Sequence, residues 1–375
     1  MSDDQPAARR RLGRRSRGGV STRPFWAARL EDAVNRRIGR LMVRLGHRVK
    51  VEPYASYGTE TKVRILARTV YTDAPVRNPD DVPAYEHLRL VRGWRNFTIV
   101  IAPHSEVTVE VGGHTHHLVS DRAGIIDQVV DADLEPGWNI ATITCCSGEV
   151  VRSEVYCVAE GTTFGIISDI DDTVMVTALP RPMLAAWNAF VLHESARRVV
   201  PGMPVLYQDL IRAHPGAPVV YLSTGAWNVA PTLRRFLAAH RFPPGPLLLT
   251  DWGPTNSGFF RSGQAHKRAN LRDLIQAYPN IKWLLIGDDG QHDPAIYADL
   301  AREFPGHVHA IALRQLTPGQ HVLAHGALES EFRHAAGSRV VGGHDGRELG
   351  LALAELGVVA DQAPEQVGFA EVDEV

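Results

Sequence analysis

The sequence predicts two folded domains, an antiparallel β-sandwich followed by an α/β domain built on a parallel sheet. The length of 375 residues suits two domains. Between residues 48 and 160 apolar and polar side chains alternate with the period of strands. After residue 160, short apolar runs alternate with helical stretches, which indicates βαβ units.

The composition is that of an ordinary globular protein. Hydrophobic residues make up 44% of the chain and charged residues 22%, which excludes a wholly disordered chain and a collagen-like fibre. No apolar run approaches the roughly 18 residues that a transmembrane helix requires. The three cysteines lack the C-x-x-C spacing of a zinc ribbon. We therefore expect a cytoplasmic protein, with peripheral membrane contact as an option considered below.

Positive charge is concentrated at the N-terminus. Residues 1–50 carry fourteen Lys and Arg against four Asp and Glu, although the net charge of the whole chain is −2. Residues 1–22 are expected to form a disordered basic arm. No hydrophobic stretch follows these arginines at once, so they lack the pattern of an export signal.

A basic amphipathic helix is predicted over residues 23–47. Pro24 suits its first turn, and Gly46 suits the position after its last. Its apolar stripe can pack on the body of the protein, or residues 1–46 can contact an anionic membrane. Nucleic acid is not the expected partner, because nothing in this region offers base readout. The stripe consists of Trp26, Leu30, Val34, Ile38, Leu41, Met42 and Leu45.

Residues 48–160 are predicted to form a β-sandwich of the immunoglobulin type, without its cysteine pair. Gly112-Gly113 marks a hairpin turn within it. Beside that turn, His114, His116 and His117 could bind a metal, but we expect them to be surface polar residues. The predicted strands include Lys62–Tyr71, Phe97–Ile101, Val107–Val111 and Trp138–Thr144.

Residues 161–330 are predicted to form the α/β domain, and residues 331–375 a less regular extension with an acidic tail. The predicted strands are Phe164–Ile167, Val219–Leu222, Leu247–Leu249, Trp283–Ile286 and Val308–Leu313. The predicted helices cover 184–197, 204–213, 229–240, 265–277 and 294–303.

Three of the predicted strands end in polar residues. One is followed by Asp169–Thr173, the second by Ser223, and the third by Asp288 and, further on, Asp293. Groups at the carboxyl ends of parallel strands converge on one crevice, the usual place of an active site. Lys267 is one of only four lysines and lies on the helix that leads into the third strand. We expect it to be the positive partner of these groups.

Clustered carboxylates repel one another and are tolerated only with a cation or with shifted pKa values. Together with water and a substrate phosphate, they make a Mg²⁺ site rather than a soft-metal site. One carboxylate can attack a phosphoryl group, and a second can protonate the leaving oxygen. The alternatives are an acidic turn or a calcium loop. Thr173 and Val174 do not fit the calcium-loop pattern.

The motifs Asp169-x-Asp171-x-Thr173, Ser223, Lys267 and Gly287-Asp288-x-x-x-x-Asp293 resemble, in this order, the four motifs of the haloacid dehalogenase superfamily. A closer resemblance is to the phosphatidate phosphatase catalytic domain of the actin-patch-protein type, and it is carried by Phe164–Thr173, Tyr221–Ser223 and Leu285–Tyr297. Lipin-type phosphatases carry a related core. Upstream, Tyr54-Ala-Ser-Tyr57-Gly-Thr59 resembles the start of the strand-rich region that precedes this domain in bacterial members.

The resemblance implies a Rossmann-like haloacid dehalogenase core with a small cap. It implies that Asp169 is the nucleophile and a Mg²⁺ ligand. Asp171 becomes the general acid and base, with its backbone carbonyl also reaching the metal. Thr173 holds the turn of the motif and is grouped with the phosphate-binding residues.

The remaining motifs receive roles in the same way. Ser223 and Lys267 are implied to bind the phosphoryl group. Asp288 is implied to be the second carboxylate ligand of Mg²⁺, and Asp293 to support the metal shell. Asp289 receives no role from the resemblance.

The predicted function is hydrolysis of a phosphate monoester by way of an aspartyl-phosphate, with a lipid phosphate such as phosphatidate as substrate. Residues 178–202 could form an apolar cap that accepts an acyl chain, or they could pack on the core. Arg261 could clamp a phosphate. Two alternatives stay open: a phosphatase for a soluble monoester, and a lipid-phosphate-binding module without turnover.

Overall fold

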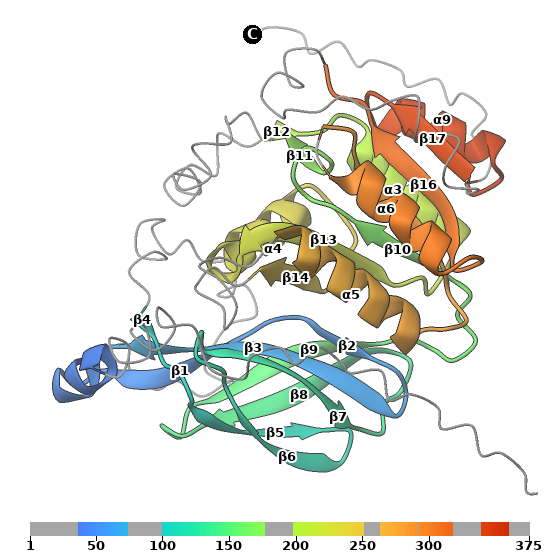
Figure 1. Cartoon of the computed structure of the whole chain (residues 1–375). Helices are drawn as coiled ribbons and strands as arrows, with labels where there is room; N and C mark the ends of the chain where they lie inside the picture. Colours follow the sequence, from blue (N-terminus) through green and yellow to red (C-terminus); the bar gives the residue numbers. More distant parts are fainter. Residues whose placement is uncertain are drawn as a thin grey trace, which may run out of the picture.

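The computed structural model describes residues 37–73, 100–176, 198–250, 263–290, 292–317 and 339–359. It consists of an all-β part, Arg48–Val158, and an α/β part, residues 164–359, which we call the β domain and the α/β domain (Figure 1). The predicted arm, the first part of the N-terminal helix, Arg261 and the acidic tail lie outside the described residues. Among the described helices, none has the length and apolar character to cross a membrane.

The described end of the predicted N-terminal helix projects from the β domain (Figure 1). Residues 37–44 are helical, and Gly46 follows as predicted. The apolar stripe is only partly covered in this segment. Ile38 is half-buried, whereas Leu41 is 50% exposed and Leu45 61% exposed.

In the described part of the β domain, nine strands form one continuous hydrogen-bonded sheet. The order is β1-β3-β2-β9-β8-β5-β6, and β4 and β7 also pair with β3. All pairs are antiparallel except β2 with β9. The immunoglobulin-type sandwich stays a prediction, because the strands form one linked sheet with a parallel pair. The strands are β1 (Arg48–Pro53), β2 (Ser56–Gly58), β3 (Lys62–Thr72), β4 (Val100–Ile101), β5 (Glu106–Val111), β6 (His114–Val119), β7 (Ile125–Asp131), β8 (Gly137–Cys145) and β9 (Val150–Cys157).

The alternating pattern builds the interior of the β domain. Along β5, Val107, Val109 and Val111 are buried while the residues between them are not, since successive side chains of a strand point to opposite faces. The predicted hairpin joins β5 to β6 through Gly112 and Gly113, which have φ angles of 52° and 75°. Left-handed φ at both central residues is the requirement of a tight two-residue hairpin turn.

The described residues of the α/β domain form a six-stranded sheet in the order β14-β13-β10-β15-β16-β17, with every neighbouring pair parallel. Numbered along the chain this is the doubly wound order 3-2-1-4-5-6. The predicted parallel sheet is thus confirmed. Its strands are β10 (Phe164–Ser168), β13 (Val219–Ala226), β14 (Leu247–Thr250), β15 (Lys282–Asp288), β16 (Val308–Arg314) and β17 (Arg339–Gly343).

Helices cover both faces of this sheet. Helices α5 and α6 contact one another on one face, and α3 and α9 contact one another on the other (Figure 1). Four of the predicted helices are present, and the one predicted over 184–197 lies outside the described residues. The helices are α3 (Met203–Ala213), α4 (Ala230–Ala239), α5 (Gly263–Ala277), α6 (Asp293–Glu303) and α9 (Gly346–Glu355).

The parallel sheet continues beyond residue 330, the predicted end of the α/β domain. Strand β17 pairs with β16, and α9 packs against α3. Leu349 and Leu353 of α9 are fully buried. The short segment Arg339–Gly343 lacks a strong strand pattern, and it becomes a strand because the edge of β16 offers it hydrogen bonds.

A short two-stranded sheet joins the two ends of the segment predicted to form the cap. Strands β11 (Met175–Val176) and β12 (Arg198–Val199) pair antiparallel just after the first motif. Most of the predicted cap, residues 178–197, lies outside the described residues.

The two domains share one hydrophobic core. Tyr54, Tyr57 and Leu66 of the β domain belong to the same buried cluster as Trp227 and Tyr278 of the α/β domain. A second cluster, which includes Val109 and Ile143, lies within the β domain alone.

Candidate active site

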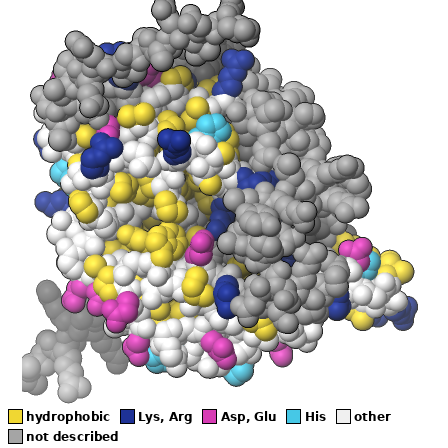
Figure 2. Space-filling model, turned by 180° about the vertical axis from the view of Figure 1, so that it is seen from behind, with side chains coloured by type: hydrophobic (Ala, Val, Ile, Leu, Met, Phe, Trp, Pro, Cys, Tyr) yellow, Lys and Arg dark blue, Asp and Glu magenta, His cyan; other side chains and the backbone are white. Residues whose placement is uncertain are grey.

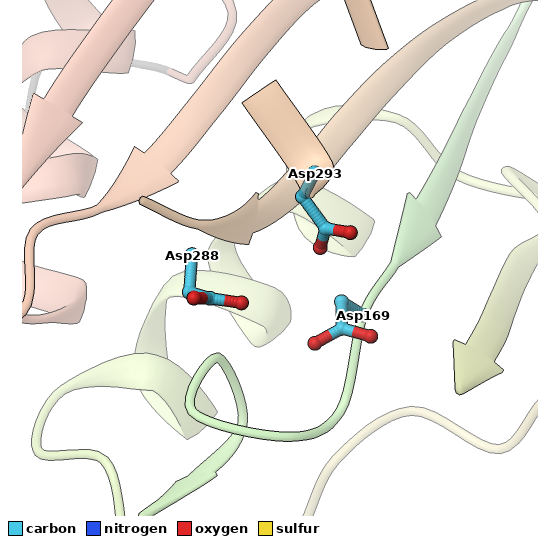
Figure 3. Close-up of side chains that lie close together, drawn as sticks. All are labelled: Asp169, Asp288 and Asp293. Carbon is cyan, nitrogen blue, oxygen red and sulfur yellow. The ribbon is translucent and has the colours of Figure 1, made fainter. Parts of the chain in front are cut away.

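Three buried carboxylates meet at the carboxyl ends of the two central strands. β10 and β15 are neighbours, and Asp169 directly follows β10 while Asp288 ends β15. This is the switch point of the strand order, where ligands bind in open α/β sheets. Asp293, the first residue of α6, completes the group. One carboxylate oxygen from each residue lies within 4.8 Å of the others (Figure 3).

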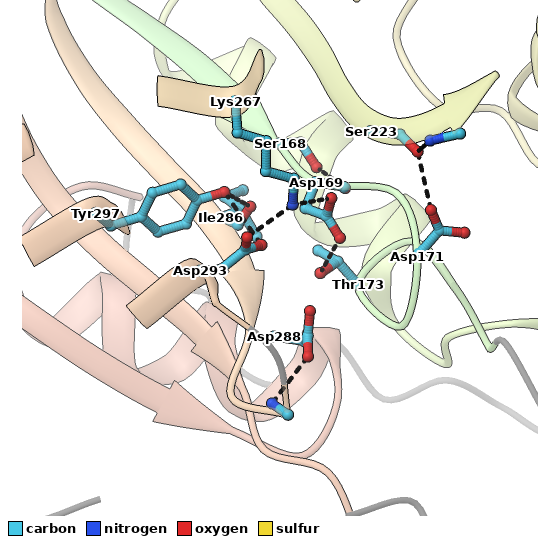
Figure 4. Close-up of polar contacts among 12 residues, drawn as sticks. Ser168, Asp169, Asp171, Thr173, Ser223, Lys267, Ile286, Asp288, Asp293 and Tyr297 are labelled. Carbon is cyan, nitrogen blue, oxygen red and sulfur yellow. Dashed lines mark hydrogen bonds and ion pairs between the residues drawn. The ribbon is translucent and has the colours of Figure 1, made fainter. Parts of the chain in front are cut away.

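Lys267 supplies the positive charge that the sequence predicted for this site. It projects from α5, and its Nζ lies 2.6 Å from Asp169 Oδ1 and 2.7 Å from Asp293 Oδ1 (Figure 4). Burial alone would lower the pKa of Lys267, but these two carboxylates outweigh burial and raise that pKa. The ammonium therefore stays charged. An ammonium has three N–H donors, and these two contacts use two of them.

Asp288 carries an unsatisfied oxygen. Its Oδ1 accepts a hydrogen bond of 2.8 Å from the Gly290 amide, whereas its buried Oδ2 finds no hydrogen-bond partner among the described residues. Burial, followed by the nearby Asp293, raises the pKa of Asp288 well above its usual range. A buried carboxylate oxygen without a partner is costly. This oxygen, beside two further carboxylates, fits a divalent cation with oxygen ligands.

The surroundings of Asp169 also raise its pKa well above the usual range. Burial is the main cause that raises its pKa, and Lys267 opposes that effect while the neighbouring carboxylates add to it. When all three carboxyl groups are ionised, the single ammonium leaves the cluster with an excess of negative charge. A divalent cation would balance this excess.

The side chain of Asp171 points away from the carboxylate cluster and toward β13 (Figure 4). Ser223 Oγ donates a hydrogen bond of 2.9 Å to Asp171 Oδ2 and accepts one of 3.0 Å from the Gly225 amide. The side chain of Asp171 is thus separate from Asp169, Asp288 and Asp293, and only its backbone carbonyl could serve the metal role implied by the sequence.

Comparison with known proteins concerns this same part of the chain. Residues 164–315 match the family model described as the catalytic domain of phosphatidate phosphatase APP1. This segment of the chain is therefore similar to that family of catalytic domains, and we call it the APP1-type domain. It spans the sheet from β10 to the end of β16, with all of the carboxylates described above.

Two yeast proteins match the APP1-type domain. Phosphatidate phosphatase APP1 of Saccharomyces cerevisiae is 31% identical over 151 residues, and an uncharacterised protein of Schizosaccharomyces pombe is 27% identical over 152 residues. Each match covers 40% of this chain and 25% of the relative. The matched part thus spans about a quarter of the length of these relatives. Among solved structures, the haloacid dehalogenase domain of the Legionella pneumophila effector Lem4 aligns with 43% of this chain and 90% of its own, at 15% identity and a TM-score of 0.29.

The turn after β10 holds the nucleophile candidate of the APP1-type domain. Thr173, fully buried, donates from Oγ1 to Asp169 Oδ2 at 3.4 Å. Thr173 therefore contacts the carboxylate itself, in keeping with a role in the turn. Asp172 adopts a left-handed φ of 55°, a conformation that Asp tolerates better than most residues.

Arg314 ends β16 beside Asp288 and was not predicted as a site residue. Its Nη1 donates 2.7 Å to the Asp172 carbonyl, and its Nε donates 3.2 Å to the His344 carbonyl. One signal was available, because Arg314 directly follows the predicted strand Val308–Leu313. The same strand-end rule that found Asp169 and Ser223 applied there.

Two buried tyrosines complete the surroundings of the site, and neither was predicted. Tyr297 on α6 donates 3.1 Å to the Ile286 carbonyl and lies 3.5 Å from Asp293 Oδ2. Tyr207 on α3 shares a hydrogen bond with Ser168, the residue before Asp169. Their spacing on the helices looks the same as that of ordinary core residues, so the sequence offers no separate signal.

The remaining candidates lie elsewhere. Asp289 Oδ1 accepts a hydrogen bond from the Leu316 amide, so this residue secures the chain after β16. His114 pairs with Asp133, and His116 with the Asp131 carbonyl. These histidines form no metal-ligand group among the described residues, where the carboxylate cluster is the group found.

Proposed function

We propose that this chain is a Mg²⁺-dependent phosphatase that hydrolyses a lipid phosphate such as phosphatidate. One observation carries the proposal: the cluster of Asp169, Asp288, Asp293 and Lys267, in which a buried oxygen of Asp288 has no partner among the described residues. The match of residues 164–315 to a phosphatidate phosphatase catalytic domain supports the substrate class. The parallel sheet order also suits the finer prediction of a haloacid dehalogenase-like core.

The proposed reaction has two steps. In the first, a carboxylate oxygen of Asp169 attacks phosphorus, so a P–O bond to Asp169 forms and the P–O bond to the alcohol breaks. Asp171 donates a proton to the departing oxygen, and the alcohol leaves. In the second, Asp171 takes a proton from water as the water oxygen attacks phosphorus. The bond to Asp169 then breaks, and inorganic phosphate and the Asp169 carboxylate are regenerated.

The other side chains hold charge and position in this scheme. Lys267, fixed by Asp169 and Asp293, directs its remaining N–H toward a phosphoryl oxygen. Ser223 orients Asp171 through their hydrogen bond. The groups that would hold Mg²⁺ are the carboxylates of Asp169, Asp288 and Asp293 and the backbone carbonyl of Asp171. When bound, the ion supplies positive charge that offsets the charge of the phosphoryl group.

Peripheral contact with an anionic membrane is part of the proposal, and it places the protein at the cytoplasmic surface of that membrane. The helical segment 37–44 exposes Arg37, Arg40 and Arg44 together with Leu41, and the exposed Leu45 directly follows it. Figure 2 presents this end of the chain as a projection on which hydrophobic and basic side chains lie side by side. Apolar side chains with flanking arginines favour the interface of an anionic bilayer.

The test is phosphate release from phosphatidate in mixed micelles, with and without Mg²⁺, with an aryl phosphate in parallel. The control is Asp169→Asn. We expect Mg²⁺-dependent release that prefers phosphatidate and disappears in the variant. Release from the aryl phosphate alone would favour the soluble-monoester alternative. Folded protein that releases phosphate from neither substrate would favour the binding module.

A further inference from the structure

We propose that the β domain positions the phosphate-binding side of the active site, with Tyr54 and Arg68 as positioning residues that act through the segment after Ser223. The inference rests on the proposed function for its catalytic consequence. It assigns a role to the β domain, which lies outside the region that matches the APP1-type family. The two domains lie side by side along the β14 edge of the parallel sheet (Figure 1).

The first contact joins Tyr54 to Trp227. Their rings stack with centroids 4.6 Å apart and planes inclined by 20°. Both side chains are buried, at 4% and 6% exposure. Trp227 begins η6 (Trp227–Val229), which directly follows β13. The stack therefore holds the chain only four residues beyond Ser223.

The second contact joins Arg68 to Asn228, the residue after Trp227. Arg68, on β3, is 5% exposed, and its guanidinium donates a hydrogen bond to Asn228 Oδ1. A buried guanidinium with a side-chain acceptor in fixed geometry holds its partner more firmly than an exposed contact does. Trp227 and Asn228 are thus both held by the β domain.

The chain between Ser223 and Trp227 needs such an anchor. The pairing of β13 with β14 is regular at Leu222 but shifts in register before Ala226. Within this irregular stretch, the Gly225 amide bonds back to Ser223 Oγ. The ladder therefore has no pair at residues 223–225 and resumes at Ala226, which pairs with Thr250. Directly beyond that pair, the contacts of Trp227 and Asn228 with the β domain also hold the far end of the stretch.

A separate set of contacts reaches α5, the helix that carries Lys267. Arg64 donates 2.8 Å to the Tyr57 hydroxyl and lies 3.7 Å from Asp273 of α5. The Tyr57 ring in turn contacts the ring of Tyr278, just after α5, at a centroid distance of 6.4 Å. The β domain thus holds the two elements that carry Ser223 and Lys267.

The catalytic consequence follows from the hydrogen bond between Ser223 and Asp171. A loosened Ser223 segment would misplace the phosphoryl-binding hydroxyl and at the same time weaken its hydrogen bond to the Asp171 side chain. Since both act on the reacting phosphoryl group, kcat should fall more than KM rises for a small aryl phosphate. A merely destabilised β domain would instead lower the melting temperature and leave both constants unchanged in the folded protein.

The experiment combines hydrogen exchange of the full chain with steady-state kinetics on an aryl phosphate. The variants are Tyr54→Leu, Asn228→Ala and the conservative Tyr54→Phe, which keeps the stacked ring. The matched control is Ile143→Val, a trimmed side chain in the core of the β domain that is fully buried away from the interface. Asn228 is only partly buried, and its variant tests the second contact, between Arg68 and Asn228. Since this change leaves the buried Arg68 guanidinium without that acceptor, the melting temperature of each variant is measured as well.

We expect amides of residues 223–229 to exchange about three- to tenfold faster in Tyr54→Leu and Asn228→Ala, the factor that matches the loss of one aromatic pair or hydrogen bond. The kcat of both should fall, and Tyr54→Phe should restore both readouts. Equal exchange and kcat in Tyr54→Leu, Asn228→Ala and Ile143→Val would overturn the proposal. If wild-type protein releases no phosphate, the proposed function fails, and the exchange of residues 223–229 alone decides whether the β domain orders this segment.

Discussion

Arg314 Nη1 donates a hydrogen bond of 2.7 Å to the backbone carbonyl of Asp172, inside the turn that carries the nucleophile candidate. Asp172 has a left-handed φ of 55°, a conformation that few residues other than Gly, Asn and Asp adopt readily, and the arginine holds its carbonyl in place. Through Nε, Arg314 also contacts the His344 carbonyl, just after β17. The arginine thereby connects the turn to a part of the sheet beyond the region that matches the catalytic family.

The first prediction concerns Arg314→Met. The variant leaves the Asp172 and His344 carbonyls without their donor, so the turn should shift. A misplacement of about 1 Å near the reacting groups can lower kcat roughly 100-fold, and we expect a loss of about 10- to 100-fold. Steady-state kinetics on an aryl phosphate measures it. The control is Arg339→Met, which changes an exposed arginine on the neighbouring strand β17; equal kcat in the two variants would contradict the role.

The carboxylate cluster could be predicted from the sequence because it depends on a local pattern, a polar residue at the end of an apolar strand. Asp169, Ser223 and Asp288 each follow or end an apolar strand, and parallel strands bring such ends together. Arg314 obeys the same rule, but its contact with Asp172 depends on the order of strands across the sheet. The stack of Tyr54 on Trp227 joins two residues that lie in different domains and far apart in the sequence. No local sequence pattern predicts such a contact. Strand β17 escaped prediction because its pairing partner, rather than its composition, makes it a strand.

The second prediction concerns Asp288→Asn. In metal-free protein this change removes a buried charge whose Oδ2 has no partner among the described residues. The free energy of unfolding should therefore rise by about 1 kcal/mol. The stabilisation by Mg²⁺ should disappear. Thermal unfolding in chelator and in excess Mg²⁺ measures both effects. The matched control is Asp289→Asn, since Asp289 bonds to the Leu316 amide outside the cluster, and this variant should keep the Mg²⁺ response.

The third prediction concerns the pH dependence of the Mg²⁺ effect. Burial and neighbouring carboxylates raise the pKa values of Asp169 and Asp288 in the folded, metal-free state. A carboxyl group whose folded pKa is raised favours the folded state most below its unfolded pKa. That contribution is lost as the pH rises through the folded pKa. Metal-free protein therefore loses this contribution toward neutral pH, where ionised carboxylates bind Mg²⁺ best.

The rise in melting temperature on adding Mg²⁺ should accordingly be larger near about pH 8 than near about pH 5. Calorimetry at both pH values, each with chelator as reference, provides the measurement. A Mg²⁺ shift of the same size at both pH values would mean that these carboxyls do not bind the ion. Asp289→Asn again serves as the control and should follow the wild-type pH dependence.

The fourth prediction concerns Gly287, the residue before Asp288 on β15. A Cβ atom added there would lie 2.7 Å from Asp293 Oδ2 and 2.8 Å from Tyr297 Cε2. Neither neighbour can yield freely, because Asp293 is bound to Lys267 and Tyr297 is fully buried and hydrogen-bonded to the Ile286 carbonyl. Gly287→Ala should therefore displace Asp293 from the cluster.

The displacement should separate Asp293 from Lys267 and lower kcat by about tenfold or more. Overpacking at this site should also destabilise the protein by about 1–3 kcal/mol. Kinetics on the aryl phosphate and thermal unfolding measure the two effects. Gly161→Ala provides the control, because a Cβ at Gly161 would meet nothing within 4 Å. If both Gly287→Ala and Gly161→Ala kept the wild-type kcat, the tight contact between Gly287 and Asp293 would have no part in holding the Asp293 carboxylate in place.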